Sequence, residues 1–181
     1  QRALLSQRFV LAGQGTALST AAAYLEGAGC TLVATPREVV ADEVGYRLGR
    51  AAVGSPLSHA IAPPAFEALP DRPDGLLAEC TGEALVASAF RGPRVVMGRL
   101  AGEGAPAAVA SCAVGGCSGC FAQALARLSP GLSGARAVEA GSVAALIAER
   151  LVLELDEGVA LRVLRPQGSL EEEVERCSRC R

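Results

Sequence analysis

Three cysteines in one short segment have the spacing of a metal site. Cys112, Cys117 and Cys120 follow a C-x4-C-x2-C pattern in a glycine-rich stretch, and Cys177 and Cys180 form a C-x2-C pair farther along the sequence. Thiolates bind zinc and iron–sulfur clusters, and small residues between them let a loop wrap closely around the bound group. We therefore predict a metal centre with Cys112, Cys117 and Cys120 as ligands and either Cys177 or Cys180 as the fourth.

The spacing of the first three cysteines resembles the signature of plant-type [2Fe–2S] ferredoxins. That signature has a small residue at the third position between its first two cysteines and another after the second cysteine, and this sequence has Gly115 and Ser118 there. The resemblance implies a [2Fe–2S] cluster and a role in electron transfer. Zn²⁺ would be held by the same four thiolates. A further interpretation is that all the thiols are free and buried as small apolar side chains.

A second motif is typical of nucleotide binding. Gly13, Gly15 and Thr16 lie between an apolar run and an alanine-rich stretch, as in a strand–turn–helix unit. In dinucleotide-binding proteins such a turn brings a phosphate to the amides of the helix N-terminus. Leu18 stands where that fingerprint has its third glycine. The motif therefore leaves two alternatives, a nucleotide site at Gly13, Gly15 and Thr16 or a simple tight turn.

The composition excludes several classes of function. All 17 basic residues are arginine, so Schiff-base lysines, pyridoxal-phosphate lysines and the lysine of a phosphate-binding P-loop are absent. His59 is the only histidine, so a metal site in this chain must depend on Cys, Asp and Glu.

Charge and cysteine content indicate the partners and the compartment. A net charge of −2 with few aromatic residues argues against nucleic-acid binding. The apolar runs are shorter than the roughly 20 residues that span a bilayer, so we expect no membrane span. Seven cysteines are an odd number, which fits a reducing compartment, either the cytoplasm or an organellar matrix or stroma. We expect other protein subunits as partners.

The order of apolar and helix-prone segments predicts one α/β domain over residues 1–181. Strands are expected at 8–12, 31–35, 76–80, 94–100, 135–139 and 159–164. Helices are expected at 17–26, 36–50, 82–90, 121–128, 142–153 and 171–181. Gly54 and five prolines within residues 54–75 predict a loop or lid there. Strands that alternate with helices indicate a mostly parallel sheet with helices on both faces.

The sequence thus favours a small iron–sulfur or zinc protein that transfers electrons or serves as a structural subunit of a larger complex. One alternative is a non-catalytic accessory or assembly subunit with free thiols. The other is a nucleotide-binding α/β domain.

Overall fold

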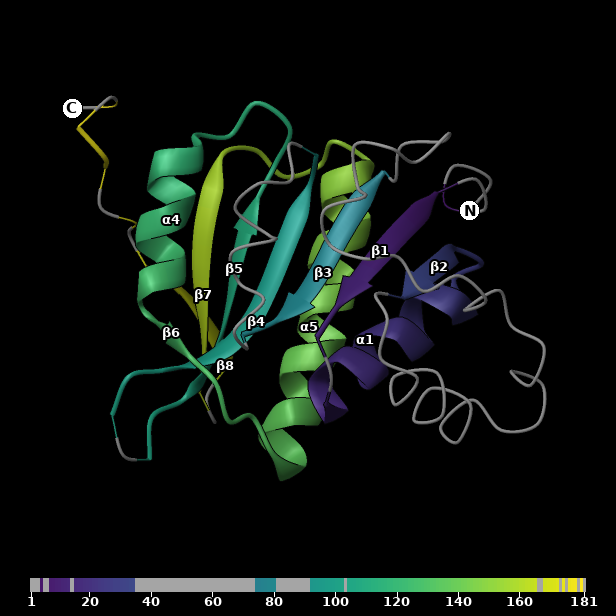
Figure 1. Cartoon of the computed structure of the whole chain (residues 1–181), viewed down its shortest axis with the longest axis horizontal. Coiled ribbons are helices and arrows are strands. Elements are labelled where there is room, and N and C mark those ends of the chain that lie inside the picture. Colours follow the sequence, from purple (N-terminus) through teal and green to yellow (C-terminus); the bar gives the residue numbers. More distant parts are fainter. Residues whose placement is uncertain are drawn as a thin grey trace.

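The computed structural model shows an α/β domain built on one mixed sheet (Figure 1). It describes residues 4, 7–13, 15–34, 74–80, 92–102, 104–165, 168–172, 174, 176–178 and 180. The earlier elements are β1 (Arg8–Ala12), α1 (Thr16–Gly27), β2 (Thr31–Ala34), β3 (Gly75–Glu79) and β4 (Arg94–Leu100). The later elements are β5 (Ala107–Cys112), α4 (Ser118–Ala126), β6 (Leu128–Ser129), α5 (Gly134–Val152), β7 (Val159–Arg165) and β8 (Gly168–Glu172).

The sheet is parallel in its first half and antiparallel in its second. Its strand order is β2-β1-β3-β4-β5-β7-β8, with β6 paired to the end of β4. The four strands β1 to β4 are mutually parallel, whereas β5 is antiparallel to β4, β7 to β5 and β8 to β7. Since β7 again points the same way as β4, most of the described strands share one direction, as the sequence predicted.

Helices cover both faces of this sheet, which confirms the predicted fold class. The alternate residues of each strand divide between two apolar cores. Phe9, Leu77 and Met97 face α1 and α5 on one side, while Val10 and Val96 face α4 on the other. None of the helices in the described part of the chain is both long enough and apolar enough to cross a membrane.

The two helices of the first face approach each other unusually closely. A Cβ atom on Gly141 of α5 would lie 2.3 Å from the carbonyl oxygen of Ala17 in α1 and 2.7 Å from the Cβ of Thr20. Only glycine permits this approach, because any side chain would overlap the backbone of the neighbouring helix. The small residues of these helices therefore set how tightly α1 and α5 pack.

Three sequence-based expectations for secondary structure are wrong. The segment 135–139, expected as a strand, belongs to α5, and its Ala137 is fully buried against the sheet. The segment 107–112, to which we assigned no element, forms β5 in the middle of the sheet. The expected helix at 171–181 begins instead as the end of β8, because this segment pairs with β7, and no helix is present in the described residues after it.

Other expectations fall outside the described residues. They are the helices at 36–50 and 82–90 and the loop or lid at 54–75, of which only residues 74 and 75 are described.

Candidate metal centre

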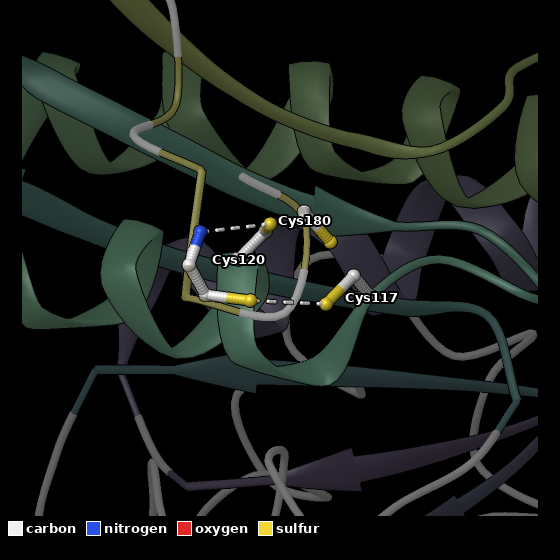
Figure 2. Close-up of side chains that lie close together, drawn as sticks. Cys117, Cys120 and Cys180 are labelled. Carbon is white, nitrogen blue, oxygen red and sulfur yellow. Dashed lines mark hydrogen bonds between the residues drawn. The ribbon is translucent and has the colours of Figure 1, made fainter.

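Four cysteine sulfurs come together at the start of α4. The Sγ atoms of Cys117, Cys120, Cys177 and Cys180 all lie within 4.8 Å of one another. Figure 2 shows the labelled Cys117, Cys120 and Cys180 with their sulfurs turned toward a common centre. This group of four, called here the four-thiol group, could hold a metal ion.

Each half of the group is positioned by local backbone structure. Cys117 is the N-cap residue of α4, and Cys120 lies in the first helical turn, so the C-x2-C spacing places both thiols at the same end of the helix. Cys177 and Cys180 are joined by a turn in which the Cys180 amide donates to the Cys177 carbonyl at 2.9 Å. Two short turns therefore each present a pair of sulfurs.

Direct contacts join the two halves. The Cys177 amide donates to the Cys120 Sγ at 3.5 Å, and the Sγ atoms of Cys117 and Cys177 are also 3.5 Å apart (Figure 2). A Cβ on Gly119 would lie 2.8 Å from the Cys177 Sγ, so a side chain there would push the C-terminal pair away. The lack of a side chain at Gly119 therefore lets the two cysteine pairs approach each other.

The electrostatics of the group already favour a thiolate. Hydrogen bonds from the Cys120 amide and from the thiols of Cys180 and Cys177 lower the pKa of Cys117 to about 6. The same network raises the pKa of Cys180 to about 12. The main cause is the hydrogen bond of its thiol with Cys117, and hydrogen bonds with Cys120 and Cys177 add to it. Near neutral pH the metal-free group thus contains a thiolate at Cys117, the form that binds metal.

Cys112, the first residue of the predicted ligand pattern, is not part of the four-thiol group. It ends β5 with its side chain fully buried in the core under α4, and its thiol points toward the Ala113 carbonyl at 3.6 Å. Burial raises its pKa, although the nearby Arg94 acts in the opposite direction. Both Cys177 and Cys180 join the group, where we expected one of them. Cys30 and Cys80 are buried elsewhere, as free thiols.

The predicted nucleotide residues lie in a tight turn between β1 and α1. Gly13 and Gly15 have φ of +107° and +130°, conformations that favour glycine, and Thr16 begins the helix. No side chain caps this helix end. A Cβ on Gly15 would lie 2.6 Å from Oε2 of Glu79, so a buried carboxylate packs against the turn. Glycine conformations therefore join β1 to α1 here, and an acidic group lies beside them.

Sequence reasoning missed a buried arginine beside the four-thiol group. Arg94 is the first residue of β4 and is only 2% exposed. Its guanidinium donates to the Ser118 Oγ at 3.2 Å and lies 4.8 Å from the centre of the Phe121 ring. An arginine directly before the apolar run of Val95, Val96 and Met97 was the only sequence signal for it.

Comparison with known proteins identifies a fold and no family. No protein-family model matches the chain, and no curated protein matches its sequence. Solved structures of E. coli MccB are similar, including the complex with succinimide, at a TM-score of 0.63 and 10% identity over 99% of this chain and 67% of that one. The microcin C7 biosynthetic enzyme MccB in complex with N-formylated MccA gives 0.62 and 11%, over 99% and 68%. PaaA gives 0.57 and 15%, over 96% and 75%. Identities this low show a shared fold alone.

Proposed function

We propose that Cys117, Cys120, Cys177 and Cys180 bind one Zn²⁺ ion, and that the protein is a structural or accessory subunit stabilised by that ion. The zinc would fasten the segment after β8 to the start of α4. The chemistry it supplies is cross-linking, since zinc has no redox function and a site with four protein ligands leaves no open position for a substrate.

The compactness of the four-thiol group is the observation that carries this proposal. In a tetrahedral zinc site with Zn–S bonds of about 2.3 Å, the sulfurs are about 3.8 Å apart. The four Sγ atoms already lie within 4.8 Å of one another, so a contraction of about 1 Å or less would complete the site. Little of the fold would have to move.

An iron–sulfur cluster fits less well. A cluster holds several metal atoms and bridging sulfides, so its cysteine ligands must be farther apart than those of a single ion. The ferredoxin-like pattern also needs Cys112, whose thiol is buried in the core under α4. A mononuclear site with two C-x2-C pairs agrees with both observations, and with Zn²⁺ as its ion it would have a structural role.

The ion would join the segment after β8 to the start of α4. In that segment Val174 packs on the core under α4, and Cys177 contacts the sulfurs of Cys117 and Cys120. Without an ion, four neighbouring thiols have no common partner, and deprotonating more than one of them brings like charges together. We infer that zinc would add a cross-link between this segment and the start of α4.

A second candidate function is nucleotide binding at the turn of Gly13, Gly15 and Thr16. It is supported by the shape of that turn and by the fold, since similar structures include E. coli MccB with ATP. The Glu79 carboxylate beside the turn would repel phosphate, so we expect any nucleotide binding to require Mg²⁺. Thermal stabilisation by ATP that appears only with Mg²⁺ would support this function.

Metal analysis of the purified protein and its cysteine variants tests the proposal. We expect one zinc per chain in the wild type and in Cys112→Ser, and loss of zinc in Cys117→Ser and Cys177→Ser. The protein should be colourless. Iron in place of zinc, or equal zinc content in all variants, would refute the four-thiol zinc centre.

A further inference from the structure

Arg94 is a buried cation that lies between the sheet and α4, the helix at whose start the four-thiol group lies. On β4 it is directly opposite Cys112 of β5, and paired residues of antiparallel strands have their Cβ atoms about 4.5–5.5 Å apart on the same face. That face is the one covered by α4. Arg94 therefore extends toward the first turn of α4.

Both of its side-chain contacts on α4 are next to proposed metal ligands. Nη2 donates to the hydroxyl of Ser118, the residue after Cys117, and the guanidinium stacks on Phe121, the residue after Cys120. The remaining hydrogen bond runs from Nη1 to the Gly92 carbonyl at 3.2 Å. Arg94 thus contacts the helix at the two positions that follow its metal-binding cysteines.

None of these partners carries a negative charge. Within the described part of the chain Arg94 has no ion pair with a carboxylate, and its buried Nε has no hydrogen-bond acceptor. Burial lowers the pKa of the Arg94 guanidinium, and the Cys112 thiol acts in the opposite direction. A charge taken out of water without a counter-charge is strongly unfavourable, so a buried arginine calls for an anionic group nearby.

A zinc tetrathiolate would be that anionic group. One Zn²⁺ ion with four thiolates carries two net negative charges. Arg94 contacts Ser118 and Phe121, which directly follow Cys117 and Cys120, so its charge lies close to two of the four thiols. Arg94 and Cys120 are buried, so an attraction between them is screened less than it would be in water.

We propose that Arg94 is the buried counter-cation of the four-thiolate centre and that its charge raises the affinity of that centre for Zn²⁺. Arg94 is a positioning residue here, since it reaches the ligands through Ser118 and Phe121 and does not touch the metal. The proposal rests on the zinc centre proposed above. It predicts that removing the charge of Arg94 lowers the affinity for Zn²⁺. If Arg94 only packed against α4, its charge would not affect this affinity.

Zinc affinity, measured by competition with a chromophoric chelator, tests the role of the charge. Arg94→Met and Arg94→Gln both remove the charge, and the second keeps hydrogen-bond donors. Arg94→Lys keeps the charge, and Ser118→Ala removes only the hydrogen bond. Arg99→Met removes a half-buried arginine of the same strand and serves as a matched control.

We expect Arg94→Met and Arg94→Gln to bind zinc about 10- to 100-fold more weakly, as is typical for the loss of a group that supports metal ligands. Arg94→Lys and Ser118→Ala should lose less, and Arg99→Met should match the wild type. The absorption of the Co²⁺-loaded Arg94→Gln protein should remain that of a tetrathiolate, which shows that the ligands are unchanged.

The possible failures are distinct. A wild-type protein that binds no zinc refutes the metal centre itself. A wild type that binds zinc, together with Arg94 variants of equal affinity, refutes only the role of Arg94. If Arg94→Met does not fold without metal, the comparison of Arg94→Gln with Arg94→Lys still tests the proposal. Equal zinc affinity in the neutral Arg94→Gln and the charged Arg94→Lys would contradict it.

Discussion

Replacing Gly141 by alanine tests the close contact between α1 and α5. The new Cβ would lie 2.3 Å from the Ala17 carbonyl oxygen and 2.7 Å from the Cβ of Thr20, so α1 or α5 must move by about an ångström. Gly27, in the last turn of α1, is the matched control, because a Cβ there would have no atom within 4 Å.

The expected magnitude follows from two opposing effects. Overpacking a core typically costs about 1–3 kcal/mol, and the upper value applies here because the contact is with backbone. Alanine in place of glycine in a helix gains about 1 kcal/mol. We therefore expect Gly141→Ala to lower the free energy of unfolding by about 2 kcal/mol and Gly27→Ala to raise it by up to about 1 kcal/mol.

Thermal and urea denaturation of the zinc-loaded proteins measure both changes. For a domain of this size, 2 kcal/mol corresponds to a lowering of Tm by about 4–8 °C. Gly141→Ala should leave the zinc content unchanged, since α5 packs on the opposite face of the sheet from α4, at whose start the four-thiol group lies. A Gly141→Ala protein as stable as Gly27→Ala would refute the close packing of α1 on α5.

Three further predictions concern pH, the β1–α1 turn and the surface. The pKa of Cys117 is lowered from an ordinary value of 9.0 to about 6. Between pH 6 and pH 9 the metal-free folded protein therefore holds fewer protons than the unfolded chain, and its stability should fall as the pH decreases from 9 to 6. Denaturation of metal-free Cys117→Ser should lack this slope. Gly15→Ala, which combines a φ of +130° with a contact to Glu79, should cost about 1–3 kcal/mol in urea denaturation, and no loss would contradict the tight turn. Arg127→Ala breaks an exposed ion pair with β8 and should change stability by less than about 1 kcal/mol, whereas a larger loss would show that this pair anchors β8.

The first half of the described fold was predictable because local patterns and tertiary structure agree there. The apolar run of β1 is followed by Gly13 and Gly15 and then by an alanine-rich helix, and each step uses residues that suit the local backbone. The strand β4 is equally clear, because Val95, Val96 and Met97 form a continuous buried run.

The second half was less predictable because tertiary contacts decide it. The strand β5 contains mostly alanine, serine and cysteine, which have weak strand preference, and it forms because β4 and β7 enclose it. The start of α5 resembles a strand over five residues, and only the longer spacing of Ala137, Ala140 and Ala144 shows a helical face. The acidic segment after residue 170 favours a helix locally, but pairing with β7 makes it a strand.

The candidate site was predictable in its residue types and only partly in its membership. Two C-x2-C pairs indicate a mononuclear centre once Cys112 is set aside. Sequence spacing alone could not set it aside, because the strand that buries Cys112 was not recognised. Arg94 was missed because its role depends on α4 lying over β4, a contact between segments more than 20 residues apart.

X-ray absorption at the zinc edge, on protein purified with its bound metal, tests the central claim most directly. Our account predicts one zinc per chain surrounded by four sulfur ligands at about 2.3 Å. Ligation by oxygen or nitrogen in place of any of the four sulfurs, or a chain purified with iron in this position, would contradict it.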